Sequence, residues 1–485
     1  MTAQTILPAN TLSSGFDVAN SLMFNDGDND YLNKTPAGDG SRIKWTWSGW
    51  IKRCSLGHQP IFSTPGNSGN IYDEFYFNST DKIQYSAVVS GTQYALRTAR
   101  QFRDTNAWYH IVLIFDSNNG TAGDRMQLWV NGVRTVEADF EDTTFKDAQN
   151  YNSATNKASY VTYIGRVSTN TAAYFDGYMA EVVFQNDNAD SPVDKFGEFD
   201  EDSPSIWKPI DVSGLTLGTN GFYLDFEDSS DLGNDAAGSN NWTANNVAAT
   251  SQMIDTPTNN HPTMNILNVP TSSGPTFSEG NLSSVSTNAN FGGSSTFGMT
   301  TGKWYCEAKC VTDSTIRNAI GITGETGELA RDNNAPTSSS SDQSSIGYLA
   351  ENGNFYNPAA GNQGSSYGDS YANDDIIGIA MDLDNMKLYF SKNGTFQNSG
   401  DPTTGATGTG AIDITVAVAD TIDGAYFVCQ GSAGASTSRF DWNFGSPPYA
   451  VSSGNSDGNG HGNFEYSVPS GYLAWCTKNL GSDGG

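Results

Sequence analysis

Hydrophobic and polar residues alternate one by one along much of the chain, which is the pattern of a half-buried β-strand. The clearest case begins with Ile379, Met381 and Leu383, which fall on one face of an extended segment. A short polar stretch follows, and Leu388 and Phe390 resume the apolar face. The pattern therefore predicts two antiparallel strands joined by a tight turn.

Turn residues separate many such segments. Asn131-Gly132 and Asn393-Gly394 are strong hairpin signals, because Asn and Gly both tolerate positive φ. No long stretch carries a helical period. The fold class predicted is all-β, with the clearest strands at residues 45–52, 74–78, 83–88, 108–115, 126–130, 133–136, 163–166, 177–184, 222–226, 302–308, 319–322, 345–348 and 442–445.

Composition supports this class and limits the partners. The chain has 485 residues, of which 36% are hydrophobic, 12% are aromatic and 52 are Gly, as is typical of turn-rich β domains. Its net charge of −29 repels nucleic acid and anionic membrane surfaces, so we expect neither as a partner. The same charge tolerates cations, Ca²⁺ above all, although acidity also serves solubility alone.

The cysteine spacing and the apolar segments exclude further classes of protein. Five scattered cysteines without a CxxC pair indicate neither a disulfide scaffold nor a zinc site. The most apolar short run, residues 111–115, is far too short to cross a bilayer, so we expect no membrane insertion. Residues 1–20 lack the basic start and long apolar core of a signal peptide, which predicts synthesis in a cytoplasm without a secretion signal.

Several motifs in the first β region follow one another in a familiar order. They are WSGWIK at 47–52, AWYHIV at 107–112, LWVNG at 128–132 and FDGYMAEVVF at 175–184. Over residues 18–190 this order resembles the concanavalin A-like, laminin-G-like family of lectin sandwiches. The resemblance implies a two-sheet jelly roll, often with bound Ca²⁺ and often binding glycans.

The second β region carries another ordered set. It comprises GKWYCEA at 302–308, AIGI at 319–322, Gly-Tyr at 347–348 and the hairpin at 377–394. This set resembles the SPRY family, a bent β-sandwich that binds proteins and other ligands. We therefore expect two antiparallel β-sandwich (jelly-roll) domains joined by a loop-rich connector: an N-terminal leader or anchor at 1–20, the lectin-like sandwich at 21–190, a connector with strand 222–226 at 191–262, and the SPRY-like sandwich at 263–485.

The order of these parts resembles an architecture of tailed-phage virion proteins. The resemblance implies a virion protein made in the host cytoplasm, an exposed tail-fibre or receptor-binding appendage that recognises host cell-surface glycan. It also implies a homo-oligomer in contact with other virion proteins, whose weak single sites gain strength from repeated copies. The alternative is a capsid decoration or fibre-assembly protein, and the remote alternative is a glycan depolymerase.

Two loops of the first region carry candidate calcium ligands. Asp26 and Asp28 alternate along one acidic loop, and Asp116 and Asp124 flank another. The first loop is no EF-hand, because Tyr31 stands where Gly is required. Carboxylates from separate loops that converge on one ion are the predicted Ca²⁺ site.

Candidate ligand-binding residues in the second region are Phe355, Tyr356, Tyr367 and Tyr371, which lie in a Gly- and Asn-rich stretch. Aromatic rings in polar loops suit sugar binding, because ring faces meet C–H groups while amides bind hydroxyls. The other interpretation is that these rings fix the loop to the sandwich.

An enzyme that hydrolyses glycans would require a pair of catalytic carboxylates. Glu198, Asp200 and Asp202 alternate as do catalytic carboxylates of sandwich glucanases, but Pro204 follows at once and no strand pattern surrounds them. We interpret this stretch as a solvated acidic loop. No catalytic residue is predicted, and the protein is expected not to be an enzyme.

Overall fold

The structure is a computed structural model that is nearly all β, with 43% of residues in strands and 8% helical. It describes residues 15–66, 71–89, 91–167, 173–187, 193–269, 274–286, 291–312, 318–324, 345–357, 360–415, 424–432 and 437–483. Most of the predicted leader, at 1–14, lies outside these residues. The described part of the chain has no helix long and apolar enough to cross a membrane.

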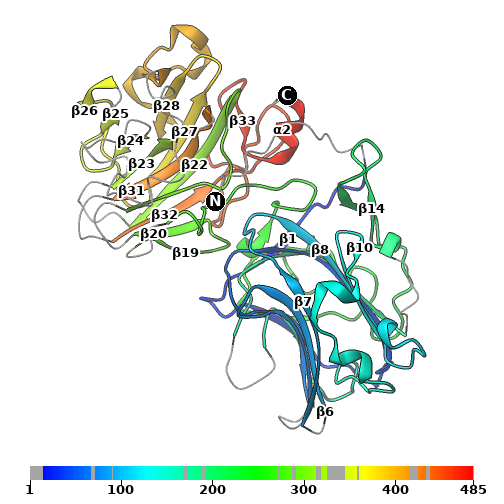
Figure 1. Cartoon of the computed structure of the whole chain (residues 1–485). Helices are drawn as coiled ribbons and strands as arrows, with labels where there is room; N and C mark the ends of the chain where they lie inside the picture. Colours follow the sequence, from blue (N-terminus) through cyan, green and yellow to red (C-terminus); the bar gives the residue numbers. More distant parts are fainter. Residues whose placement is uncertain are drawn as a thin grey trace. The chain divides into compact units, whose positions relative to one another are not determined.

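The chain divides into two compact units, whose boundary in sequence lies between Thr258 and Asn259 (Figure 1). The first unit contains two antiparallel sheets. From edge to edge, its first sheet consists of β10 (Val133–Arg134), β9 (Met126–Val130), β8 (Trp108–Asp116), β3 (Lys44–Arg53), β13 (Gly177–Asn186), β1 (Ser21–Phe24) and β18 (Gln252–Met253), with β16 (Phe222–Leu224) beside β13.

The second sheet of this unit also has eight strands. In spatial order they are β11 (Phe140–Asp142), β7 (Thr92–Gln101), β6 (Lys82–Val89), β5 (Ile71–Phe77), β4 (Gln59–Pro65), β12 (Thr162–Ile164), β2 (Tyr31–Lys34) and β17 (Thr243–Asn245). Three short 3-10 helices, η1 (Ala122–Asp124), η2 (Glu137–Asp139) and η3 (Thr144–Asp147), lie in the loops that follow β8 and β10 and in the loop after β11.

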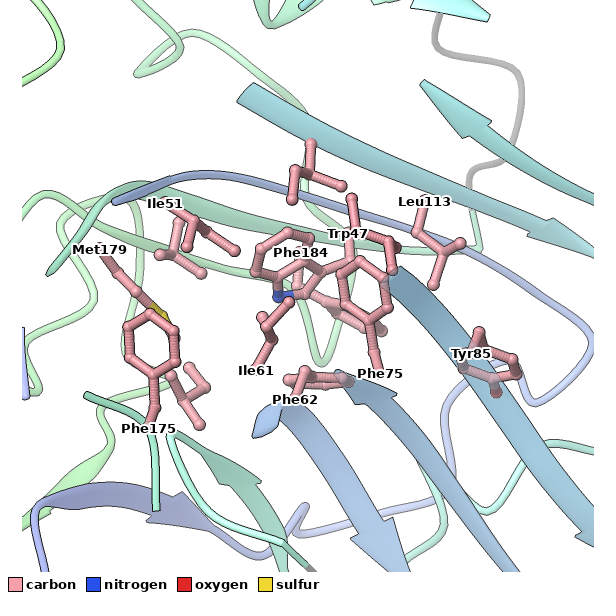
Figure 2. Close-up of a cluster of buried hydrophobic side chains, with 14 of the residues drawn as sticks. Trp47, Ile51, Ile61, Phe62, Phe75, Tyr85, Leu113, Phe175, Met179 and Phe184 are labelled. Atoms are coloured by element: carbon pink, nitrogen blue, oxygen red, sulfur yellow. The ribbon is translucent and has the colours of Figure 1, made fainter. Parts of the chain in front are cut away.

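A hydrophobic core fills the space between the two sheets. Figure 2 shows side chains from both sheets facing one another, with Trp47 and Phe184 from the first sheet opposite Phe62 and Phe75 from the second. The rings of Trp47 and Phe75 meet edge to face with centroids 5.4 Å apart. This burial is the main stabilising contribution to the sandwich, because apolar area leaves water on both inner faces.

The outer face of the first sheet is covered by the chain itself. Residues 193–217 carry an apolar set over this face, including Phe196 and Trp207, which packs with Trp50 and Val112 of the sheet. Part of this covering segment is a small hairpin of β14 (Gly197–Phe199) and β15 (Trp207–Pro209). This face of the sheet is therefore a second core rather than a surface.

A buried histidine ties the covering segment to the sheet. The indole Nε1 of Trp207 donates a hydrogen bond of 2.9 Å to Nδ1 of His110, so the ring proton is on Nε2, which lies 2.9 Å from Ser48 Oγ. Trp50 stacks on the same imidazole at 4.8 Å. Burial lowers the pKa of His110 to about 3, so the ring is neutral in the folded protein.

The segment predicted as a connector, residues 191–262, contributes strands to both sheets of the first unit. The predicted strand 222–226 is β16, which pairs with β13, while β17 and β18 pair with β2 and β1. Asp255 also fixes this segment, because its carboxylate accepts hydrogen bonds from Lys52 Nζ at 2.6 Å and Trp108 Nε1 at 3.1 Å.

The second unit is another pair of sheets, antiparallel but for one parallel pairing between residues 473–474 and 304–305. Its larger sheet runs β19 (Thr276–Ser278), β20 (Ser283–Ser286), β32 (Ser438–Asn443), β22 (Lys303–Thr312), β27 (Ile376–Asp382), β28 (Lys387–Lys392) and β29 (Thr395–Phe396), with β30 (Ile412–Asp413) and β33 (Leu473–Ala474) alongside. The other runs β21 (Phe291–Ser294), β31 (Phe427–Ser432), β23 (Asn318–Thr323), β24 (Ser345–Leu349), β25 (Asn354–Asn357) and β26 (Asn362–Ser366). A short helix, α2 (Thr477–Asp483), ends the described chain. The prediction of an all-β chain with two sandwiches is confirmed.

The predicted hairpin lies in the larger sheet as β27 and β28. Met381 pairs with Leu388 and Ile379 with Phe390, so the apolar residues share one face as predicted. Asn393 and Gly394 form the next turn, with φ of 49° and 79°. The alternation and the turn residues therefore give the correct register.

Candidate functional site

The structure does not bring the four predicted calcium ligands together. Asp26 and Asp28 follow β1, which ends at Phe24. Across the neighbouring strands β13 and β3, Phe24 lies level with the end of β8 at Trp108. Asp116 is the other end of β8, about 27 Å away at 3.4 Å per residue. The two acidic loops thus lie at opposite ends of the sandwich, and the prediction of one shared site is wrong.

Other contacts occupy part of these loops. Asp124 forms an ion pair with Arg134, with the carboxylate oxygen 2.5 Å from the guanidinium. Burial raises the pKa of Asp26, which opposes the charged form that a cation requires. Among the residues that the structure describes, no group of three or more His, Cys, Asp or Glu side chains has the geometry to hold a metal ion.

The predicted aromatic ligand residues in the second unit are mainly core residues. Tyr367 and Tyr371 are 5% and 2% exposed. The Tyr371 hydroxyl donates to the carbonyl of Tyr348, and the Tyr367 hydroxyl accepts the amide of Phe390. Their predicted role in ligand binding is wrong, because the rings fix the loop to the sandwich.

The other two predicted aromatic residues lie on β25. Phe355 and Tyr356 are half-buried, and the Phe355 ring contacts the buried Tyr367 ring with centroids 5.8 Å apart. Both side chains are therefore partly used in packing.

The acidic stretch after residue 197 is also structural. Glu198 is on β14, and Asp200 is buried, where both carboxylates lie within 3.4 Å of Lys208 Nζ. Asp200 also accepts backbone amides of Asp202 and Ser203, which shapes the turn. This differs from a solvated loop, because the lysine and the amides compensate the burial of one carboxylate.

A different surface, not identified from the sequence, gathers polar and aromatic groups. Along β5, Phe75 and Phe77 enter the core, so the alternate residues Tyr72, Glu74 and Tyr76 point outward, and all three are half-buried. The same alternation holds on the neighbouring strands. We call this outer side of the second sheet the open face, and its members include Tyr31, Asn33, Tyr72, Glu74, Tyr76, Gln84, Arg97 and Tyr163.

Hydrogen bonds hold one half of the open face in place. Ser86 Oγ receives Gln84 Nε2 at 2.8 Å and lies 3.2 Å from the Tyr76 hydroxyl. Arg97 and Lys82 both bind the carboxylate of Glu141. These contacts border a hollow of about 580 Å³, lined by Tyr76, Lys82, Gln84, Arg97, Glu141, Asn78 and neighbouring residues.

The electrostatics of this hollow follow from its contacts. The hydrogen bond from Lys82 lowers the pKa of Glu141, so that carboxylate is ionised and accepts hydrogen bonds. Burial raises the pKa of Tyr76, so its hydroxyl keeps a proton to donate. Fixed donors and acceptors beside an aromatic ring are the chemistry that binds the hydroxyls and C–H groups of a sugar.

The other half of the open face contains an arginine among tyrosines. The Arg166 guanidinium carbon lies 4.8 Å, 5.0 Å and 5.8 Å from the ring centroids of Tyr31, Tyr163 and Tyr174. These distances are within the range of cation–π attraction. We call these four residues the arginine cage.

A second hollow, of about 280 Å³, lies at the edge of the sandwich. Met126 and Phe145 form an apolar part of its wall. Two ion pairs also line it, Arg134 with Asp124 and Lys146 with Glu137. One predicted calcium ligand thus lines a hollow, but as the partner of an arginine.

The first unit is thus a two-sheet sandwich with one covered face and one polar, aromatic face. Residues 26–190 match the concanavalin A-like lectin/glucanases superfamily, and residues 303–423 match the SPRY domain. The chain therefore contains a concanavalin A-like lectin domain followed by a SPRY domain, which confirms both family resemblances. No curated protein matches the chain at a significant level.

Three solved structures to which this chain is similar are distant from it in sequence. A putative carbohydrate binding protein from Bacteroides ovatus is 19% identical, with 48% of this chain and 60% of that chain covered and a TM-score of 0.34. The heptameric SAP-like pentraxin from Limulus polyphemus is 15% identical, with 37% and 81% covered and a TM-score of 0.28. The SPRY domain of human HERC1 is 15% identical, with 33% and 87% covered and a TM-score of 0.24.

Proposed function

We propose that this chain is a glycan-binding protein whose lectin domain holds its ligand on the open face. The observation that supports this most strongly is the contrast between the two outer faces of one sandwich. The first sheet is covered by residues 193–217 of the chain, whereas the second sheet carries half-buried tyrosines and fixed polar groups. Such a face binds sugars with little loss of side-chain freedom, because its groups are already held.

The proposed binding mode follows from the groups present. The Tyr76 ring packs against the C–H face of a pyranose, while Gln84, Arg97 and Glu141 exchange hydrogen bonds with its hydroxyls. The hollow is open and shallow, so a single site binds weakly. In the homo-oligomer that we propose, several copies would bind at once and raise the apparent affinity.

For the biological setting, we propose an exposed tail-fibre or receptor-binding appendage of a phage virion, without enzymatic activity, that recognises host cell-surface glycan. The order of a lectin domain and a SPRY domain supports this role. The alternative is a capsid decoration or fibre-assembly protein, for which the SPRY domain supplies a protein-binding sandwich. Immunogold labelling of particles separates a tail appendage from a capsid decoration, and glycan binding separates a receptor-binding appendage from a fibre-assembly protein.

The binding test compares variants of the full chain on a glycan array. Tyr76→Ala is expected to weaken binding about fivefold, since one ring contact of this kind contributes about 1 kcal/mol. Arg97→Ala is expected to weaken it further, because it also removes one of the two cations that hold Glu141. Phe199→Ala is the matched control, since it removes a 44% exposed ring from the covering segment.

Two results would contradict the proposal. The first is a wild-type chain that binds no glycan on the array. The second is a wild-type chain that binds, while Tyr76→Ala and Arg97→Ala bind as tightly as Phe199→Ala.

A further inference from the structure

We propose that the arginine cage selects an acidic sugar, with the Arg166 guanidinium binding the carboxylate of a uronic or sialic acid residue. This inference rests on the proposed function, because it names the class of glycan that the open face takes. The cage would form a subsite beside the hollow at Tyr76.

The cage belongs to the open face by the register of its strands. Leu32 and Ile164 are fully buried in the core, so the adjacent Tyr31 and Tyr163 point outward from β2 and β12. Arg166 follows β12 and pairs with Tyr174 across an antiparallel bridge. The tyrosine rings of the cage and the Arg166 guanidinium therefore lie on the same side of the sheet as the hollow.

The hydrogen bonds of Arg166 are incomplete. Its Nε is buried and has no hydrogen-bond partner, and no described carboxylate lies within ion-pair distance of its guanidinium. Arg97 on the same face differs, since Glu141 accepts its Nε–H. A buried donor without an acceptor costs stability, so the guanidinium of Arg166 is less completely hydrogen-bonded than that of Arg97.

The geometry of guanidinium favours a carboxylate as that acceptor. Its planar fork of N–H groups matches two carboxylate oxygens, whereas a sugar hydroxyl engages only one donor well. The side chain is half-buried, so its remaining donors reach solvent. The three tyrosine rings orient the guanidinium and also offer faces to the pyranose ring.

Two of the side chains beside the cage are uncharged. Asn33 and Asn245 flank the cage as neutral amides, joined by a hydrogen bond of 2.6 Å. Glu74 on β5 and Tyr163 on β12 lie in one cross-strand row, with Ser63 of β4 between them. Their backbones are therefore about 10 Å apart. The negative charge of the rest of the chain is largely screened beyond about 8 Å at physiological salt.

The cage and the hollow are close enough for one oligosaccharide. Tyr76 is two residues along β5 from Glu74, so its backbone lies about 12 Å from that of Tyr163. A chain of a few sugars would place an acidic residue on Arg166 and a neutral one on Tyr76.

The test measures binding of the full chain to an array of uronic- and sialic-acid oligosaccharides, each printed beside its carboxyl-reduced neutral counterpart. The wild type is expected to prefer at least one acidic member by tenfold or more. Arg166→Ala is expected to lose this preference while it binds the neutral counterpart within twofold of the wild type. Arg166→Lys, which keeps the charge but not the fork, is expected to lose most of it. Arg100→Ala removes an exposed arginine outside the cage, which contacts Phe102, and is the control.

The outcomes separate this inference from the proposed function. Equal binding of every acidic and neutral pair by the wild type overturns the inference and leaves glycan binding intact. Full preference retained by Arg166→Lys also overturns it, and this variant decides the matter if Arg166→Ala does not fold. Absence of binding to any glycan, neutral or acidic, overturns the proposed function and the inference together.

Discussion

A carboxyl group buried in β13 makes the stability of the lectin domain depend on pH. Glu181 lies in a β-bulge between Ala180 and Val183, with φ of +51°, and accepts a hydrogen bond of 2.7 Å from the Tyr223 hydroxyl. The side chain is removed from water, and this burial raises its pKa from 4.5 to about 8. The folded domain therefore holds Glu181 as the neutral acid at neutral pH.

The sign and size of the effect follow from proton linkage. The unfolded chain releases the Glu181 proton above pH 4.5, while the folded chain keeps it to about pH 8. Its contribution to stability is thus complete below pH 4.5 and is lost as the pH rises through 8. Between pH 6.5 and 8 we expect the free energy of unfolding to fall by roughly 1.5–2 kcal/mol, at about 1.4 kcal/mol per unit below the folded pKa.

The test is urea unfolding of the full chain at several pH values, followed by hydrogen exchange of peptides from β13. Glu181→Gln keeps the shape but does not titrate, so it is expected to remove the fall between pH 6.5 and 8. Glu201→Gln, at an exposed glutamate, is the control and is expected to retain it. Parallel pH profiles for the wild type and Glu181→Gln would refute the reasoning.

Two further predictions use the same assay. His110, held neutral by burial and by Trp207, has a folded pKa of about 3 against 6.5 unfolded, so its contribution is complete above pH 6.5 and is lost as the pH falls. We expect His110→Asn to flatten the profile between pH 6.5 and 4, and an unchanged slope would contradict this. Gly177→Ala would place a Cβ 2.2 Å from the carbonyl oxygen of Lys52, at φ of +147°, and is expected to cost about 3 kcal/mol. Gly120→Ala has no atom near its Cβ and is expected to be near neutral, so equal effects at both positions would contradict the clash.

Local patterns predicted much of the fold. The pairs Met381–Leu388 and Ile379–Phe390 form as the alternation requires, and Asn131-Gly132 turns with φ of 48° and 74°. Alternation on β5 was also sufficient to place Tyr72, Glu74 and Tyr76 on one face, a signal that the prediction of sites did not use. Local patterns did not predict the order of the strands in each sheet, because neighbouring strands come from distant parts of the chain.

The predicted sites failed where they depended on distant contacts. Asp26 and Asp116 both lie in polar loops, and only the register through β3 and β13 shows that they lie at opposite ends. Tyr367 has the sequence context of an exposed loop, yet it packs against Phe390 from another strand. Exposure is set by what packs on a residue, and that partner is remote in sequence.

The sequence by itself determined many of the strands and their turns, because alternation and turn propensity act over a few residues, and the order of its motifs carried the resemblance to the two domain families. Tertiary structure alone decided which sheet face is covered. Residues 193–217 lie on the first sheet, so Trp50 is buried there, while Tyr76 and Arg166 remain on the open face of the second. It also decided the protonation of Glu181, since a pKa responds to desolvation by the whole surrounding fold.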